Sequence, residues 1–202
     1  MLIIDPTTNS IDTTAMSGLT TPAFAKWAEG VLADNGKIYG IPYYAATVLI
    51  IDPVTDSYSA SAAPLPAPGG ADGAKWIGGV LAGNGKIYGI PAYSTSVLIF
   101  DPMTNTADTT TITGLPGDFK WLGGVLVGNG KIVGIPGSAS TLLIINTTTN
   151  TTDTATAVGP SGSKWLGGVL AGSNGNKRLF GIPHGARSVL IVEPFCSRVT
   201  GV

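Results

Sequence analysis

The sequence has very little of the chemistry on which many enzymes depend. Among its 202 residues there is one cysteine, Cys196, and one histidine, His184. A single cysteine excludes an internal disulfide and a cysteine-based metal site. A single histidine excludes a histidine-rich metal site and leaves one residue on which any Ser/His/Asp triad would depend. Paired carboxylates of the glycosidase kind and a phosphate loop of the GxxxxGK(S/T) kind are also not apparent in the sequence, so we expect no metal, no cofactor and no catalytic residues.

Charge and long apolar runs are also scarce. Charged residues make up 11% of the chain and the net charge is −1, whereas an average domain is roughly 25% charged. A nucleic-acid surface would need an excess of Lys and Arg, so we expect no nucleic-acid partner. No apolar run approaches the ~20 residues of a membrane-spanning helix, so we expect no membrane span. No signal peptide is visible, because Met1 is followed directly by LIIDP, which belongs to a repeat.

What the chain does have is one segment repeated four times. The second copy reads KWIGGVLAGNGKIYGIPAYSTSVLIFDPMTNTADTTTI, and the copies begin near residues 26, 75, 120 and 164. Each copy has four short runs rich in Val, Ile, Tyr and Thr, which favour strands. In the second copy, Asn84-Gly85 joins the first two runs with a typical hairpin turn, and a turn at Asp101-Pro102 joins the last two. Each copy therefore predicts a four-stranded antiparallel meander.

A meander of about 45 residues is the size of one blade of a β-propeller. We predict an all-β fold in a single domain, residues 1–202: a four-bladed β-propeller of four-stranded antiparallel blades. With the N-terminal strands in residues 1–16, the expected number of strands is seventeen, one more than four blades need. The preferred closure makes residues 10–15 the outer strand of the last blade, which would remove open edges. The alternative is an open arc that is completed by another chain.

The repeat resembles a known family. The pattern GGVLAGNGKIYGIP…SVLIFDPMTNT is similar to a kelch repeat in its Gly-Gly pair, its hairpin, its tyrosine and its DPxTN turn. It departs from kelch in having its tryptophan before the Gly-Gly pair rather than after the turn. The segment LIIDPTTNSIDTT is also similar to propeller repeats of the YVTN type. The resemblance covers almost the whole chain and implies a binding platform or scaffold without catalytic residues.

Candidate ligand-binding residues gather on one expected face, called the loop face here. It carries the loops that precede the first strand of each copy and the loops that join second to third strands. The candidates are Lys26, Lys75, Lys120, Lys164, Trp27, Trp76, Trp121, Trp165, Tyr44, Tyr93, His184 and Arg187. The tryptophans could stack against sugars, or each could fill the gap between neighbouring blades. The lysines could form a cationic ring, or they could point outward and solvate the rim.

Three residues depart from the repeat. His184 and Arg187 could together hold a carboxylate or phosphate, or could be plain surface residues. Glu29 replaces the first glycine of the Gly-Gly pair. It is either a tolerated substitution or a partner for Lys26.

These features favour a non-enzymatic binding or scaffold module whose partner is another protein or a larger complex. The alternative is a lectin-like module that binds carbohydrate between blades, and a third reading is an enzyme that uses His184 or the acids. A scaffold should show buried tryptophans and an exposed apolar patch. A lectin should show repeated Trp-lined pockets with open ring faces, and an enzyme should show one cleft with converging titratable groups. Low charge and the Asn-x-Thr sequons at Asn146 and Asn150 favour a secreted or luminal location.

Overall fold

The described part of the chain is built entirely from short antiparallel strands. The structure is a computed structural model, and it describes residues 2–19, 25–61, 65, 73–159, 161–172 and 177–193. Within these ranges there are seventeen strands, as expected, and no helix. Accordingly, no described helix is long and apolar enough to cross a membrane.

Four sheets follow the four sequence repeats. Sheet I contains β3 (Trp27–Leu32), β4 (Ile38–Pro42), β5 (Leu49–Asp52) and β6 (Ser57–Ala60). Sheet II contains β7 (Trp76–Leu81), β8 (Ile87–Pro91), β9 (Leu98–Asp101) and β10 (Thr106–Asp108). Sheet III contains β11 (Trp121–Gly128), β12 (Lys131–Pro136), β13 (Leu143–Asn146) and β14 (Thr151–Asp153). Sheet IV contains β15 (Trp165–Ala171), β16 (Arg178–Pro183) and β17 (Leu190–Val192).

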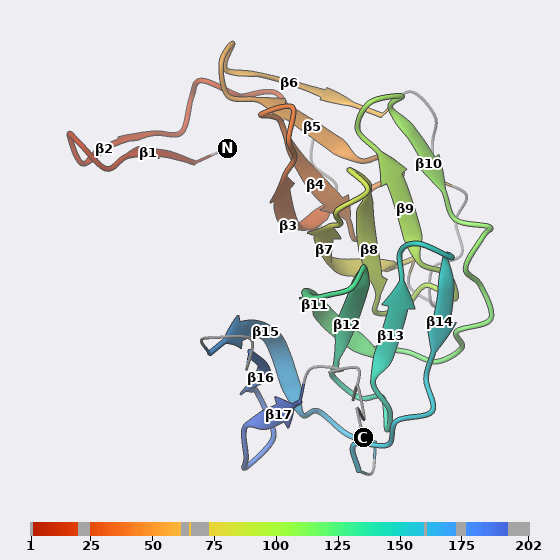
Figure 1. Cartoon of the computed structure of the whole chain (residues 1–202). Coiled ribbons are helices and arrows are strands. Elements are labelled where there is room, and N and C mark those ends of the chain that lie inside the picture. The colour runs from red at the N-terminus through yellow and green to blue at the C-terminus, as the bar shows by residue number, and fades with distance from the viewer. Residues whose placement is uncertain are drawn as a thin grey trace, which may run out of the picture.

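The sheets stand side by side along an arc, in chain order (Figure 1). Their first strands face the inside of the arc, where β3 contacts β7, β7 contacts β11, and β11 contacts β15. The fourth strands, β6, β10 and β14, lie on its outside. This arrangement follows from the meander, because each strand pairs with the next one outward from the inner strand.

A β-bulge follows the tryptophan in each first strand. In sheet II, Trp76 is opposite Pro91 and Gly79 is opposite Gly89, with a register shift between the two pairs. Gly78 occupies the bulge with a φ of 77°, a left-handed conformation that glycine adopts without steric cost. The bulge therefore explains the first glycine of the Gly-Gly pair, which the sequence repeats directly after the second residue of the strand.

The hydrophobic core lies between the sheets. Between sheets I and II, Val31 and Ile41 pack with Trp76 and Leu98, and all four are buried. Equivalent clusters join sheet II to sheet III and sheet III to sheet IV. A single sheet cannot bury both of its faces, so each sheet is stabilised by its neighbours.

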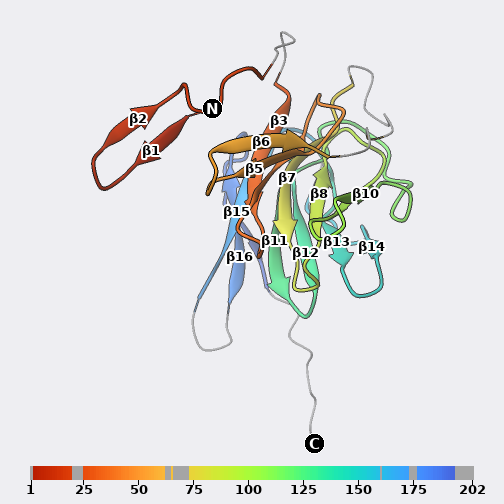
Figure 2. The same cartoon turned by 90° about the horizontal axis from the view of Figure 1, so that it is seen from above.

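The expected closure by residues 10–15 is not present. The N-terminal strands β1 (Ile3–Asp5) and β2 (Ser10–Asp12) pair with each other as a two-stranded hairpin, and sheet IV has three strands in the described residues. The hairpin projects beside sheet I, away from sheet IV (Figures 1 and 2). The physical reason is local packing, because Met16 holds the following segment against Leu49 and Ile51 of sheet I. The described residues therefore form an open arc.

Candidate functional site

The four tryptophans occupy the same position in the four sheets. Each indole N–H donates a hydrogen bond to the backbone carbonyl oxygen two residues before the third strand. The four pairs are Trp27 with Thr47, Trp76 with Ser96, Trp121 with Thr141, and Trp165 with Ser188. Trp76, Trp121 and Trp165 are only 0%, 4% and 6% exposed. These three rings fill the space between neighbouring sheets and offer no open face for stacking.

The lysine before each tryptophan organises the loop face through its backbone. In sheet II, the carbonyl oxygen of Lys75 accepts N–H groups from Ala92, Tyr93 and Ser94, at 2.9 to 3.1 Å. Lys26 and Lys164 accept three N–H groups in the same way, and Lys120 accepts two. The structure thus brings the loops before first strands and the loops after second strands together on one face, as the sequence predicted.

Three of the four lysine side chains turn toward backbone carbonyl groups. The ammonium nitrogen of Lys120 donates to the carbonyl oxygens of Ala92 at 3.2 Å, Ser94 at 3.0 Å and Gly117 at 2.6 Å. The other three side chains lie as follows: Lys164 donates to Ala139, Lys75 donates to Gly73, and Lys26 lies over the ring of Trp27. Because Lys75 and Lys120 are each only 4% exposed, they neither solvate the rim nor form an open cationic ring.

Burial changes the acidity of these lysines. It lowers the pKa of Lys120 to about 8, and the nearby carboxylate of Asp118 opposes this effect. Burial also lowers the pKa of Lys75 and of Lys164. Desolvation has this direction because it disfavours the charged form of an amine.

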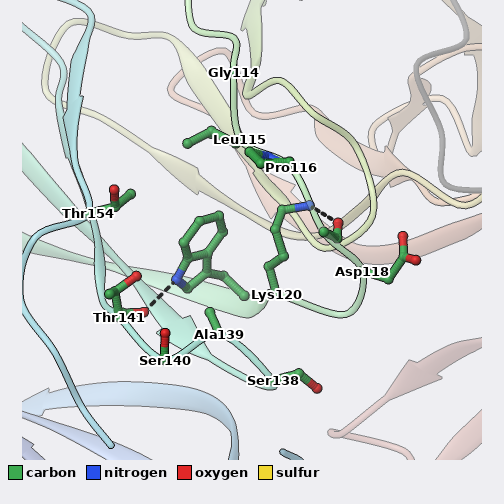
Figure 3. Close-up of a pocket in the computed structure, with 12 residues that line it drawn as sticks. Gly114, Leu115, Pro116, Asp118, Lys120, Ser138, Ala139, Ser140, Thr141 and Thr154 are labelled. Carbon is green, nitrogen blue, oxygen red and sulfur yellow. Dashed lines mark hydrogen bonds between the residues drawn. The ribbon is translucent and has the colours of Figure 1, made fainter. Parts of the chain in front are cut away.

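A cavity of about 330 Å³ lies beside Lys120 and Trp121 (Figure 3). Its polar lining includes Asp118, Ser140 and Thr154. A smaller cavity of about 220 Å³ occupies the equivalent place in sheet I and is lined by Lys26, Trp27, Thr47 and Leu19, among others. The repeat therefore creates at least two related cavities along the tryptophan positions.

The loop face also carries a row of aromatic rings. Tyr44 lies 4.6 Å from Tyr43, Tyr43 lies 6.1 Å from Tyr93, and Tyr93 lies 5.9 Å from Phe119, measured between ring centroids. All four side chains are half-buried, so each keeps some accessible surface. We call these four residues the aromatic row. It runs from sheet I across sheet II to the segment before sheet III.

The candidates named from the sequence include Tyr44 and Tyr93 of this row but not Phe119. Phe119 directly precedes Lys120 and has a φ of 51°. An aromatic residue rarely adopts this left-handed conformation, and such strain is concentrated at functional sites. No local signal in the sequence marks this backbone strain. However, Phe119 directly precedes the Lys-Trp pair that every repeat contains, and this placement could have suggested that Phe119 lies on the loop face.

His184 and Arg187 lie at the far end of the loop face, in sheet IV. His184 is exposed, and its Nδ1 is 3.0 Å from the hydroxyl oxygen of Ser163. Arg187 is exposed as well. Among the described residues no group of three or more His, Cys, Asp and Glu side chains is arranged to hold a metal ion.

Glu29 occupies the inner side of the arc. Its φ is 68°, close to the 77° of its glycine counterpart Gly78. Its side chain reaches across to sheet II, where Oε2 lies 2.7 Å from the place that a Cβ on Gly78 would take. Burial raises the pKa of the carboxyl group. The substitution of glycine by glutamate thus puts a strained acidic residue next to the inner strand of sheet II.

No protein-family model and no curated protein matches the sequence. Solved structures do match. Virginiamycin B lyase from Staphylococcus aureus is similar with a TM-score of 0.71 at 13% identity, over 95% of this chain and 59% of that chain. An auxiliary nutrient binding protein from Bacteroides ovatus is similar with a TM-score of 0.65 at 12% identity, over 96% of this chain and 49% of that chain.

A third match is the extracellular domain of a hybrid two-component system from B. thetaiotaomicron. Its TM-score is 0.57 at 13% identity, over 94% of this chain and 23% of that chain. The chain thus spans little more than half of the lyase and about half of the nutrient binding protein. Identities this low show the fold alone. The fold that they support is the β-propeller repeat fold.

Proposed function

We propose that this protein is a non-enzymatic binding module that engages another protein through its loop face. The observation that carries the proposal is the aromatic row, in which half-buried rings from three successive segments line up within 4.6 to 6.1 Å of each other. Tyrosine and phenylalanine provide large contact areas for little loss of side-chain entropy, and aromatic residues are enriched in protein interfaces.

The surroundings of the row support a binding role. Strained Phe119 ends the row, and the buried Ser94 and Ser96 support the loop that carries Tyr93, with a 3.1 Å hydrogen bond from the Ser96 N–H to the Ser94 hydroxyl. The rings are therefore presented by a backbone that is already ordered, and such preorganisation lowers the entropic cost of binding.

Both features expected of a scaffold support this choice. Three of the four tryptophans are buried, and sheet IV exposes several large apolar side chains. The proposal of a non-enzymatic role is supported by the ammonium groups of Lys75 and Lys120, which are occupied by backbone carbonyl groups rather than free to act on a substrate. Within the proposal, each sheet is one blade, the repeats are kelch-like, and the described arc contains four blades.

A lectin-like role is the second candidate. The specific observation in its favour is the pair of equivalent cavities beside Trp27 and Trp121. The hydroxyl-rich lining of the larger cavity, with Ser140 and Thr154, is suited to hydrogen bonding with a sugar. Against it stands the burial of Trp121, whose ring is only 4% exposed.

An extracellular or luminal location forms part of the proposal. Two of the matched structures are a nutrient binding protein and an extracellular domain. The Asn-x-Thr sequons are compatible with it. The side-chain oxygen of Asn146 accepts the N–H of Thr148, and that of Asn150 accepts the hydroxyl of Tyr88. A glycan attaches to the amide nitrogen and would leave both of these oxygens in place.

The test is to probe an array of extracellular proteins and a glycan array in parallel with the labelled chain. A variant with Tyr93→Ala and Phe119→Ala removes half of the aromatic row. The matched control carries Val54→Ser and Met103→Ser, because these apolar side chains are highly exposed on the turns opposite the loop face. We expect protein binding that is lost in the first variant and retained in the second. Binding to sugars alone, or equal protein binding by both variants, would overturn the proposal.

A further inference from the structure

Sheet IV exposes apolar side chains whose counterparts in the other sheets are buried. Ile182, Val189 and Ile191 are 49%, 51% and 50% exposed. The counterparts of Ile182 are Ile41, Ile90 and Ile135, which are 0% to 1% exposed. The counterparts of Val189 are Val48, Val97 and Leu142, which are 0% to 2% exposed. The counterparts of Ile191 are Ile50, Ile99 and Ile144, which are 5% to 8% exposed. The exposed face of sheet IV therefore has the composition of an interface between sheets.

In the interior of the arc, the next sheet covers this face in a specific way. The isoleucine before the proline that ends each second strand lies against the second glycine of the Gly-Gly pair in the next sheet. A Cβ added to Gly79 would lie 2.5 Å from Cδ1 of Ile41, and a Cβ on Gly124 would lie 2.7 Å from Cδ1 of Ile90. Gly168 and Ile135 repeat the contact at 2.9 Å. An isoleucine that fits against a glycine is thus the recurrent contact between sheets.

The two ends of the arc carry the two unmatched halves of this contact. Ile182 in sheet IV has no glycine of a following sheet against it in the described residues. Gly30 in sheet I is the counterpart of Gly79, and a Cβ added to it would meet only Ile38 of its own sheet, at 3.1 Å. Because the sheets are repeats, the exposed face of sheet IV matches the outward face of sheet I, on which Ile3, Leu19 and Met16 pack in the described residues.

We propose that the exposed face of sheet IV binds sheet I of a second copy of this chain, with Ile182 against Gly30 of that copy. Each of the three observed contacts between sheets joins the same two kinds of face, so a fourth contact between copies continues an interface that already exists. The chemistry of the partner surface is therefore known, since it is the surface that sheet I presents. Two such contacts, one at each end, would join two arcs in a ring.

The N-terminal hairpin fits the same arrangement. Its strands correspond by sequence to third and fourth strands, and Ile3 packs against the cluster of sheet I as a residue of a preceding sheet would. Leu2, Ile4 and Ile11 of the hairpin region are 58%, 58% and 67% exposed. β17 has no fourth strand beside it in the described ranges. In the assembly, Ile191 of one copy takes the place of Ile3, its counterpart in the repeat, on sheet I of the other copy. The displaced hairpin then lies beside the open edge of sheet IV and removes that edge from solvent.

The first test is the mass of the 202-residue chain in solution, measured by light scattering over a range of concentrations. We expect twice the mass of one chain for the wild type, and the mass of one chain for Ile182→Asp. The matched control is Met103→Asp, which also replaces an exposed apolar residue and should keep the double mass. Far-UV circular dichroism of both variants checks that they are folded. A wild type that stays a single chain, or a double mass that survives Ile182→Asp, would overturn the proposal.

The second test identifies the contact itself. A chain with Cys196→Ser, Gly30→Cys and Ile182→Cys is treated with a short bismaleimide. We expect covalently linked pairs of chains on a denaturing gel, whereas the control pair Gly30→Cys with Met103→Cys should remain uncrosslinked. Crosslinking within one chain only would mean that the arc closes on itself, and this would contradict the proposal. The variant with Tyr93→Ala and Phe119→Ala should still have twice the mass of one chain and should still crosslink between chains when it carries the two cysteines. Failure of the proposed pairing of copies can therefore be distinguished from failure of the proposed binding role.

Discussion

The indole nitrogen of Trp76 donates a 2.7 Å hydrogen bond to the backbone carbonyl oxygen of Ser96, and both residues are buried. The bond connects the beginning of the first strand in sheet II to the segment before its third strand. It does so while the ring fills the space toward sheet I. One side chain therefore stabilises both the sheet and its packing against the neighbouring sheet.

Replacement of Trp76 by phenylalanine tests the hydrogen bond. Phenylalanine preserves much of the apolar contact but leaves the Ser96 carbonyl group buried without its donor. We expect the free energy of unfolding to fall by about 1–3 kcal/mol. The matched variant is Trp27→Phe in sheet I, where the ring is only half-buried. This variant should lower the free energy of unfolding by a smaller amount. Urea denaturation followed by circular dichroism measures both, and equal losses would contradict this explanation.

Replacement of Glu29 tests backbone strain. Since its φ of 68° is left-handed, a non-glycine residue there costs roughly 1–2 kcal/mol, of which the greater flexibility of glycine in the unfolded chain offsets part. We expect Glu29→Gly to stabilise the protein by about 0.5–1 kcal/mol, measured by urea denaturation at neutral pH. Glu29→Gln retains the strain and should give little of this gain.

The same residue predicts a dependence on pH. Burial raises the pKa of Glu29 above its usual 4.5, so the folded chain binds more protons than the unfolded chain just above that value. Its contribution to stability is present below pH 4.5 and is lost as the pH rises through the raised pKa. The effect should be small because the side chain keeps solvent access. The free energies of unfolding of the wild type and Glu29→Gln, measured across this pH range, should converge at low pH. A difference between the two that does not change with pH would show that the carboxyl group does not contribute.

The local structure of each repeat could be predicted because its signals are local. Turns such as Asn84-Gly85 and the alternation of strand-forming runs specify the meander without reference to other sheets. The number of strands followed from counting these signals. The closure of the arc could not be predicted in this way, because curvature depends on how closely sheets approach. That approach is set by contacts such as Ile41 against Gly79, which join residues far apart in the sequence.

The candidate site was predictable in position but not in chemistry. The loop face follows from topology, and the structure brings its loops together at Lys75 and its counterparts. Lysine is almost always an exposed residue, so the sequence offered no reason to expect the Lys120 ammonium group to be buried among carbonyl oxygens. The aromatic row depends on the distance between loops of different sheets, and for this reason Phe119 was missed.

Lys120 predicts a second dependence on pH, with the opposite sign. Folding lowers its pKa from the usual 10.5 to about 8, so between these values the unfolded chain binds more protons than the folded chain. This contribution to the stability therefore rises from pH 8 to 10.5, and the full cost of burying the ammonium group is present below pH 8. Lys120→Met removes the titrating group. The free energy of unfolding of the wild type, relative to this variant, should increase over that range, and a constant difference would contradict the lowered pKa.

Close approach between sheets predicts the effect of adding one methyl group. A Cβ on Gly79 would lie 2.5 Å from Cδ1 of Ile41 and 3.0 Å from Cγ2 of Val31, both in the neighbouring sheet. Gly79→Ala should therefore force the two sheets apart or the isoleucine out of its rotamer, and lower the free energy of unfolding by about 1–3 kcal/mol. Gly83→Ala, in the next turn, is the control, because nothing lies within 4 Å of its added Cβ. If both variants unfold at the same urea concentration as the wild type, the fit of isoleucine against glycine does not determine how the sheets pack.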